Sequence, residues 1–391
     1  MQFQNPVRNP FRTVQCPFCF EDVYPGECAV WSSINKREMV GAPKNIWKRS
    51  YRRVMPVRLT GNRKLVHEQA RRRCPHCLEL LPLYFDSSKV ENFIIAIVGA
   101  GASGKSHYIA AMINELQALR QDLIGYTELK ADGPTEEEYN KNYYEPLFVG
   151  QREIPLTNPS FDPISRPLVY RMAFPVPGPE AATRIVHLLI YDAAGEQIVQ
   201  QDQAVRYRRY LLHASAIILL ADPQKMDGIV RNLPYHLRPA PQQPGAQVRV
   251  DKAITVLNNV LELITQMMGL PPGSRLTLPI AVTLSKSDLL KSIQGLTNQP
   301  YFVRRQQAPY THRTALLHDL HFVQREVYSF LQTYGDQPLL SVPERTSRVG
   351  YFAISATGHD KQPDGTYQKV EPIRCLDPLL WVLLQLGILT V

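Results

Sequence analysis

Short apolar runs alternate along most of the chain with longer segments in which apolar residues recur every three or four positions. The short runs lie within residues 93–98, 167–174, 184–197, 214–223, 279–290 and 350–358 and predict buried strands. The longer segments, 109–119, 251–268 and 314–331, predict helices with one buried face. Strands alternating with helices predict an α/β domain with a doubly wound, mostly parallel sheet and a ligand at the carboxyl ends of its strands. The apolar "DPLLWVLL" near the end is too short to span a membrane and predicts a buried terminal helix.

A glycine-rich turn follows the first strong strand. "GAGASGKS" matches G-x-x-x-x-G-K-[ST], and it stands between the strand 93–98 and a helical pattern, which is the context that this motif requires. Its backbone N–H groups would surround phosphates, Lys105 would place a charge between the β- and γ-phosphates, and the Ser106 hydroxyl would bind Mg²⁺. The predicted phosphate site consists of Gly99, Ala100, Gly101, Ala102, Ser103, Gly104, Lys105 and Ser106.

A second stretch, "RIVHLLIYDAAGEQ", would serve the metal and the terminal phosphate. Its strand delivers Asp192 at the carboxyl end, where a carboxylate can hold the Mg²⁺ shell, and the Gly195 N–H could bond the γ-phosphate. A threonine that contacts Mg²⁺ should precede the strand 167–174. Thr157 is the first candidate for this threonine, and Thr127 and Thr135 are second choices.

Two later strand ends would hold the base. Asp288 in "SKSD" can accept hydrogen bonds from guanine N1–H and the exocyclic amine together, which adenine does not offer, and the Lys286 stem can lie along the base plane. At the next strand end, Ser355 and Ala356 could direct a backbone N–H at guanine O6. Each stretch alone is also typical of an ordinary strand-end turn.

The order G-x-x-x-x-G-K-S, D-x-x-G, S-K-x-D and S-A resembles the translation-factor-related class of P-loop GTPases. The long insertions and the terminal helix look most like the bacterial double-GTPase (DO-GTPase type 2) family. The resemblance implies a GTP-binding switch in signalling or conflict systems that hydrolyses GTP to GDP with Mg²⁺. Lys105 would then act in catalysis, Glu196 or Gln197 would orient the water, and a protein effector, possibly a second GTPase, would read the switch.

The sequence departs from that family at two positions. Ser285 replaces the usual Asn or Thr, and Glu196 stands where many relatives have a water-orienting Gln. Two alternatives stay open: an ATP-dependent P-loop NTPase whose zinc domain binds nucleic acid, and a nucleotide-bound interaction module without turnover.

Four of the six cysteines form two Cys-x-x-Cys pairs, Cys16 with Cys19 and Cys74 with Cys77. Two such turns supply the tetrahedral sulfur cage that Zn²⁺ prefers in structural sites. Disulfides and a redox pair are the alternatives, and Cys28, His67 and His76 are possible substitute ligands. Cys375 is expected in the core.

The net charge of +9 lies entirely in residues 1–90, which hold 16 Lys plus Arg against 7 Asp plus Glu. This break predicts a basic, zinc-ribbon-like domain at 1–90 and a P-loop domain at 91–391, with insertions at about 125–166, expected as a mobile loop, and 224–250. Basic runs with Trp47 and Tyr51 suit nucleic acid, an anionic surface or an acidic protein, or are a solvated face. No signal peptide or transmembrane segment is recognisable, so a cytoplasmic location is expected.

Overall fold

The structure is a computed structural model. It describes residues 13–32, 37–42, 44–45, 47–49, 70–85, 90–119, 125–155, 166–176, 182–192, 208–239, 252–293, 298–304, 313–335 and 337–389.

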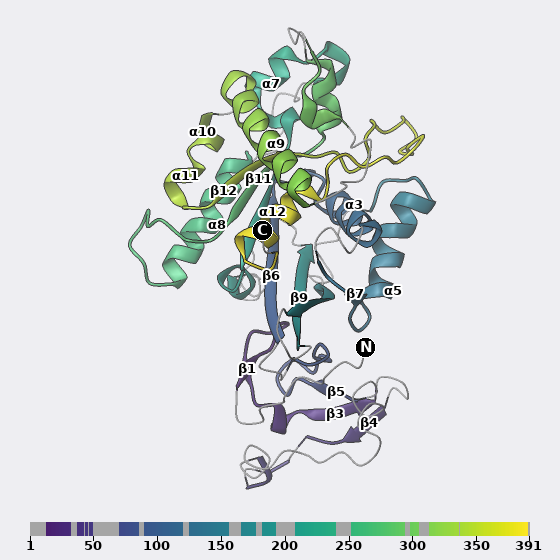
Figure 1. Ribbon diagram of the computed structural model, residues 1–391, viewed down its shortest axis with the longest axis vertical. Helices are drawn as coiled ribbons and strands as arrows, with labels where there is room; N and C mark the ends of the chain where they lie inside the picture. The colour runs from purple at the N-terminus through teal and green to yellow at the C-terminus, as the bar shows by residue number, and fades with distance from the viewer. Residues whose placement is uncertain are drawn as a thin grey trace, which may run out of the picture. The chain divides into compact units, whose positions relative to one another are not determined.

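A seven-stranded sheet in the order β12-β11-β10-β6-β9-β8-β7 is the centre of a mixed α/β fold (Figure 1). Four of its strands, β12, β11, β10 and β6, pair in parallel, and β7 pairs antiparallel with β8. The predicted α/β class with a mostly parallel sheet is therefore confirmed. The strands are β6 (Val90–Gly99), β7 (Glu128–Ala131), β8 (Leu168–Val176), β9 (Ala182–Asp192), β10 (Ala216–Ala221), β11 (Ile280–Leu284) and β12 (Val349–Ala353).

The chain divides into two compact units. Unit 1 comprises Met1–Phe93, Tyr126–Glu136 and Arg166–Leu189, and unit 2 comprises Ile94–Gly125, Glu137–Ser165 and Ile190–Val391.

Unit 1 carries two small sheets besides its share of the long strands. One joins β1 (Val14–Gln15) to β2 (Asp22–Val23), and the other has the order β4 (Arg37–Val40), β3 (Ala29–Ser32), β5 (Ala70–Arg73). The short helix η1 (Pro25–Glu27) precedes β3. Both partners of β3 run antiparallel to it, so that Trp31 stands opposite Arg71 on one side and Glu38 on the other.

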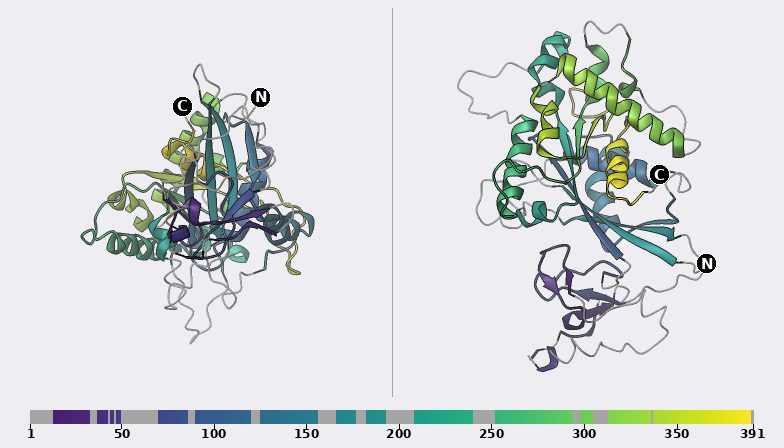
Figure 2. Two further views of the ribbon diagram at one scale, coloured as in Figure 1. Left: turned by 90° about the horizontal axis from the view of Figure 1, so that it is seen from below. Right: turned by 60° about the vertical axis from the view of Figure 1, so that its left-hand side comes forward.

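Unit 2 holds the parallel strands and most of the helices. On β10, β11 and β12 most side chains are fully buried, as expected of strands covered on both faces. Figure 2 shows α8 (Ala253–Met267) and α12 (Asp377–Gln385) on opposite faces of these strands. The other helices are α3 (Lys105–Ala118), α5 (Thr135–Tyr139), η2 (Asn140–Val149), η3 (Pro223–Lys225), α7 (Asp227–Asn232), η4 (Tyr235–Leu237), η5 (Ser287–Ser292), η6 (Tyr301–Val303), α9 (Arg313–Tyr334), α10 (Gln337–Leu340) and α11 (Val342–Arg345).

Most predicted elements coincide with observed ones. The six apolar runs became β6, β8, β9, β10, β11 and β12, and the three periodic segments became α3, α8 and α9. The terminal helix α12 is buried as expected, and Cys375 lies in the core.

The prediction of a mobile loop over 125–166 is wrong for its described part, residues 125–155. This part contains β7, α5 and the π-helical η2. Polar and glycine-rich composition suggested a loop, but Tyr139, Tyr143 and Leu147 recur every four residues and are buried. The apolar stripe is sufficient to fix the helical segment, although Pro146 lies within it.

Among the described residues, no helix combines the length and the apolar character that crossing a membrane requires.

Candidate metal centre and ligand loop

The two Cys-x-x-Cys turns of unit 1 form one cluster. The Sγ atoms of Cys16 and Cys77 are 3.8 Å apart, as are those of Cys19 and Cys74, and all four lie within 4.8 Å of one another. The predicted ligand set is therefore brought together across a gap of 54 residues. Cys28 is not part of this cluster, because its thiol donates to the Tyr24 carbonyl 3.7 Å away. The candidate His67 lies outside the described residues.

The two turns have the same backbone design. In the first, the Phe18 N–H donates to the Cys16 sulfur at 3.4 Å, and in the second the His76 N–H donates to the Cys74 sulfur at 3.4 Å. Each turn closes with a residue at positive φ, Phe20 at 61° and Leu78 at 64°. Such N–H···S bonds stabilise thiolates, so both turns prepare their sulfurs for a cation.

The protonation of the cluster is uneven. Hydrogen bonds with Cys16 and then Cys77 lower the pKa of Cys74, whereas those with Cys74 and Cys77 raise the pKa of Cys16. Four convergent sulfurs, with no further ligand grouped with them among the residues that the structure describes, match the tetrahedral set that binds zinc. The chain can thus bind a metal such as zinc at this cluster.

The arginines of the run "RRR" beside Cys74 are used within unit 1. Arg71 forms an ion pair with the buried Asp132, Arg72 donates to the Pro25 carbonyl at 2.8 Å, and the Arg73 guanidinium lies 4.1 Å from the centre of the Trp31 ring. These contacts favour a structural role for this run. Trp47, in contrast, is 87% exposed.

In unit 2 the predicted phosphate loop joins β6 to α3. A Cβ on Gly99 would lie 2.8 Å from the Leu220 carbonyl oxygen of β10, so only glycine fits there. Gly104 has φ +85°, the left-handed conformation that glycine adopts without strain, and it leads directly into α3. The Lys105 ammonium donates to the carbonyls of Gly99 at 3.1 Å and Ala100 at 3.3 Å, so its positive charge lies over the loop.

Ser106 and Asp192 meet as the sequence predicted. The Ser106 hydroxyl donates to the Asp192 carboxylate at 2.6 Å, and the Tyr143 hydroxyl of η2 donates to the same oxygen at 3.3 Å. Burial raises the pKa of Asp192, although the hydrogen bonds from Ser106 and Tyr143 and the charge of Lys105 oppose this shift. A hydroxyl and a carboxylate at this distance could share one hard cation.

The loops after β11 and β12 lie at the same edge of the sheet as this loop, because these strands run parallel to β10 and β6. Lys286 has φ 50°, and its ammonium lies 2.6 Å from the buried carboxylate of Asp222. Burial first, and then the charge of Asp288, raise the pKa of Asp360.

The last strand end forms its own turn. The Gly358 N–H donates to the Ser355 hydroxyl at 2.8 Å, and the Ser355 N–H bonds to the Ile373 carbonyl. Ala356 follows in this turn and is half-buried. The two predicted base-site stretches thus stand at one edge, each with side chains engaged in local contacts.

Four predicted site residues, Thr157, Gly195, Glu196 and Gln197, lie outside the described residues. The reserve candidates for the metal-contacting threonine have other partners in unit 1: Thr127 donates to the Ala173 carbonyl, and Thr135 accepts from the Val169 N–H.

Sequence reasoning missed three side chains around the loop. Tyr143 bonds to Asp192, the Lys225 ammonium donates to the Gly101 carbonyl at 2.8 Å, and His107 Nε2 accepts from the Ile154 N–H at 3.2 Å. The four-residue spacing of Tyr139 and Tyr143 could have revealed the first. The other two carry no motif.

Comparison with known proteins redirects the functional interpretation. No family model matches the chain. One curated relative is named as a putative ESX-1 scaffolding and assembly protein, SaeC, from Mycolicibacterium smegmatis. It is 28% identical over an alignment of 415 residues, and the alignment takes in 96% of this chain and 100% of that protein.

The recognition of the chain as a double GTPase, and the GTP-hydrolysing switch and hydrolase activity derived from it, are therefore wrong. The relative that spans the chain is named for scaffolding and assembly, and it supports neither the ATP-dependent alternative, nor the nucleotide-bound module, nor a GTPase or nucleic-acid partner. The physical reason is that a phosphate loop is a geometry that many functions share. The short motifs S-K-x-D and S-A, from which guanine binding was inferred, also occur at ordinary strand ends. The Lys286–Asp222 ion pair and the turn at Ser355 are examples of such local contacts.

Proposed function

We propose that the chain is a scaffolding protein that assists the assembly of an ESX-type secretion complex through contacts with other proteins. The observation that carries the proposal is the similarity to the SaeC protein along nearly the whole of both chains. A match of this extent runs through both units, so it does not depend on one widespread motif.

Deletion of the gene tests the proposal. We expect lower secretion of ESX-type substrates, fewer assembled complexes on native gels, and recovery of both on complementation. Normal secretion and normal assembly in the deletion strain would contradict the scaffold role. Co-purification with a component of the complex, from cells that express a tagged chain, would identify the partner.

Zinc is the metal proposed for the four-cysteine cluster. Its role would be structural, because four thiolates leave no open position for a substrate. The proposed location is the cytoplasm, as expected from the sequence, where a reducing environment keeps thiols available for a metal. Metal analysis of the purified chain, with and without a chelator, tests this assignment.

For the loop Gly99–Ser106 we propose a bound GTP or GDP with Mg²⁺ as a ligand. The support is the bent loop, the lysine over it, and the 2.6 Å contact between Ser106 and Asp192, which a shared Mg²⁺ could replace. Asp288 would face the base, and Thr157 and Gly195 would complete the phosphate end.

Equilibrium dialysis against GDP, GTP and ATP, each with Mg²⁺, tests the ligand. We expect guanine nucleotides to bind best and Lys105→Ala to weaken binding at least about tenfold, the loss of one charge-assisted contact. Lys130→Ala, which removes a 63% exposed lysine of β7, is the matched control. Equal binding by Lys105→Ala would exclude this loop as the phosphate site.

A further inference from the structure

A lysine from outside the glycine-rich turn holds the loop Gly99–Ser106 of unit 2, called here the ligand loop. The strand β10 pairs in parallel with β6, and its Leu220 stands opposite Gly99, so the turn after β10 lies beside the ligand loop. Lys225, the last residue of η3 in that turn, donates from its ammonium to the Gly101 carbonyl at 2.8 Å. This contact joins segments that are 124 residues apart in the chain. It gives the ligand loop a cationic donor that the motif G-x-x-x-x-G-K-[ST] does not contain.

The turn that carries Lys225 is braced by contacts of its own. One oxygen of the buried Asp222 carboxylate accepts from the Gln224 N–H at 2.9 Å, which caps η3, and Pro223 opens the helix with a restricted backbone. The other oxygen of this carboxylate lies 2.6 Å from the Lys286 ammonium, which belongs to the loop after β11. The backbone at Lys225 is therefore held in place independently of its contact with the ligand loop.

The contact with Lys225 fixes the direction of one peptide group. The peptide between Gly101 and Ala102 is trans, as are all those that the structure describes. In a trans peptide the C=O and the N–H that follows it point in opposite directions. Because the Gly101 carbonyl points at the Lys225 ammonium, the Ala102 N–H points away from it. Backbone N–H groups aimed in a fixed direction are the donors with which glycine-rich loops bind phosphate.

Ala102 adopts a conformation that alanine avoids. Its φ is 58°, in the left-handed region, where a Cβ crowds the following carbonyl oxygen. Gly104 also lies there, at φ 85°, whereas Ser103 between them does not. Such alternation turns successive N–H groups toward one point and is typical of an anion-binding nest. A strained residue keeps its conformation only when its surroundings hold it, and at Ala102 the hydrogen bond from Lys225 holds the preceding peptide.

We propose that Lys225 is a positioning residue for the phosphates of the bound nucleotide, and that it acts by holding the Gly101 carbonyl so that the Ala102 N–H is available to them. The inference rests on the nucleotide ligand proposed above and names a residue outside the motif that sets its affinity.

The two lysines at the ligand loop then have different tasks. Lys105 donates to the carbonyls of Gly99 and Ala100, but its ammonium is also the group expected to bind phosphate directly. Lys225 contacts the third carbonyl, that of Gly101, and acts on the ligand only through the backbone. Its effect should therefore be the same for every ligand that carries the same phosphates, whichever base is attached.

The test is calorimetric titration of the full-length chain with GDP and with inorganic pyrophosphate, each with Mg²⁺. Lys225→Met removes the ammonium and keeps an unbranched apolar stem. We expect it to weaken both probes by the same factor, about tenfold, through the loss of one charge-assisted hydrogen bond. Lys225→Arg keeps a cationic donor and should bind more tightly than Lys225→Met. Lys252→Met is the matched control, because it removes an ammonium that pairs with Asp227 of α7 at 3.1 Å, and it should bind normally.

A second substitution separates positioning from a general loss of structure. Ala102→Gly allows a φ of 58° without strain. In the natural chain, where Lys225 already holds the peptide, we expect this change to leave binding nearly unaltered. In the Lys225→Met background it should tighten binding by about threefold to fivefold, because the strained conformation no longer has to be imposed by the ligand. Every variant should keep the circular dichroism spectrum of the natural chain.

Three results would overturn the proposal. These are unchanged binding of both probes to Lys225→Met, weaker binding of GDP without weaker binding of pyrophosphate, or an effect of Ala102→Gly that is equal in both backgrounds. Failure of the natural chain to bind either probe would refute the nucleotide ligand and the role of Lys225 with it. A preference of the natural chain for ATP over GTP, together with weaker pyrophosphate binding by Lys225→Met, would refute the guanine assignment alone.

Discussion

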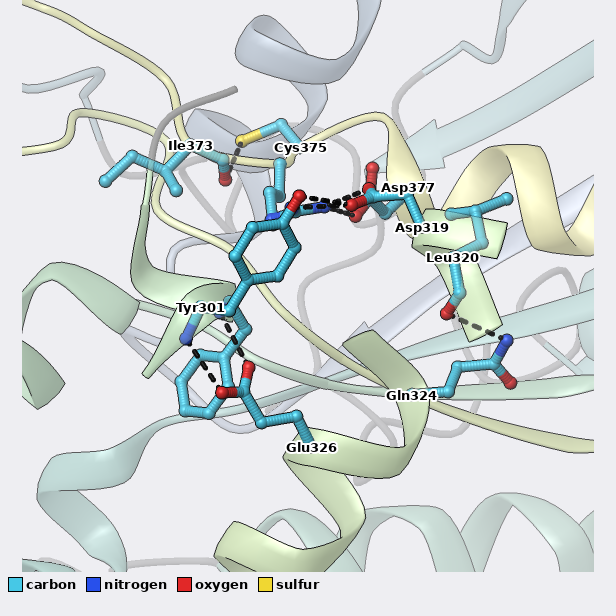
Figure 3. A network of polar contacts seen from close by, with 10 residues as sticks. Tyr301, Asp319, Leu320, Gln324, Glu326, Ile373, Cys375 and Asp377 are labelled. Carbon is cyan, nitrogen blue, oxygen red and sulfur yellow. Dashed lines mark hydrogen bonds and ion pairs between the residues drawn. The ribbon is translucent and has the colours of Figure 1, made fainter. Parts of the chain in front are cut away.

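Arg374 offers the sharpest test of how unit 2 is stabilised. Its side chain is only 2% exposed and pairs with Asp319 at 2.7 Å and with Asp377 at 2.9 Å, thereby joining α9 to the start of α12 (Figure 3). Arg374→Ala would leave two carboxylates without their counter-charge. Removing one partner of a buried ion pair costs about 3–5 kcal/mol. At roughly 2.1 cal/mol/K of unfolding entropy per residue, a chain of 391 residues would then melt about 4–6 °C lower.

The backbone at this position provides a matched control. Arg374 has φ 53°, a conformation that costs an ordinary residue about 1 kcal/mol and glycine almost nothing. Arg374→Gly removes the same guanidinium but relieves this strain. We therefore expect the free energy of unfolding of Arg374→Gly to exceed that of Arg374→Ala by about 1 kcal/mol. Arg374→Gly should accordingly unfold at a higher urea concentration, although both variants are less stable than the natural chain.

The pH dependence gives a second readout. Burial raises the pKa of Asp377 to about 6, against the opposing charge of Arg374. The folded chain therefore binds this proton more tightly than the unfolded chain. The stabilisation from Asp377 is complete below about pH 4 and is lost as the pH rises to about 6. Without Arg374 the pKa of Asp377 should rise further, so the deficit of Arg374→Ala should be larger at pH 8 than at pH 5.

Urea unfolding followed by tryptophan fluorescence at both pH values measures these differences. A loss below about 1 kcal/mol in Arg374→Ala, or a deficit that shrinks as the pH rises, would refute the argument that these carboxylates depend on the guanidinium.

Three further outcomes are expected. Cys16→Ser should lower the zinc content from about one ion per chain, the stoichiometry of a four-thiolate site, whereas Cys28→Ser should not; equal zinc in both variants would count against the cluster. Gly99→Ala should destabilise by about 1–3 kcal/mol through the clash with β10, more than the roughly 1 kcal/mol of Gly104→Ala; the reverse order in urea unfolding would refute the close approach. Burial lowers the pKa of His107 to about 4. Below about pH 6.5 the folded chain therefore binds fewer protons than the unfolded chain. Its free energy of unfolding should fall by up to about 3 kcal/mol as the pH falls to 4. His107→Gln should flatten this slope, and an unchanged slope would assign it to other groups.

The strands and long helices could be predicted because their signal is local. An apolar run such as residues 93–98 needs burial on both faces, and the loop after it needs glycines where β10 approaches and where the chain turns left-handed into α3. The pairing of Ser106 with Asp192 followed from two strand ends at one sheet edge. The four-cysteine cluster followed from the matching spacing of two cysteine pairs.

What the sequence could not reveal depends on contacts between distant segments. No sequence pattern near Arg374 predicts its contact with Asp319, which lies 55 residues earlier in the chain. The helix η2 was not predicted because its buried tyrosines lie among polar residues. The functional prediction was wrong for a different reason. Loop geometry constrains which ligand can bind, whereas scaffolding depends on exposed surface, which carries no short motif. The boundary expected at residues 90–91 and the roles of the individual loop residues stay predictions.

The cysteine cluster also has a consequence for how the chain can vary. A metal bound by Cys16, Cys19, Cys74 and Cys77 would cross-link the two ends of the 54-residue segment between the cysteine pairs. The entropic cost of closing such a loop grows only with the logarithm of its length, so that doubling the segment would cost about 0.6 kcal/mol. Natural variants could therefore lengthen this segment at a small entropic cost, provided that both cysteine turns and the sheet of β3, β4 and β5 are kept.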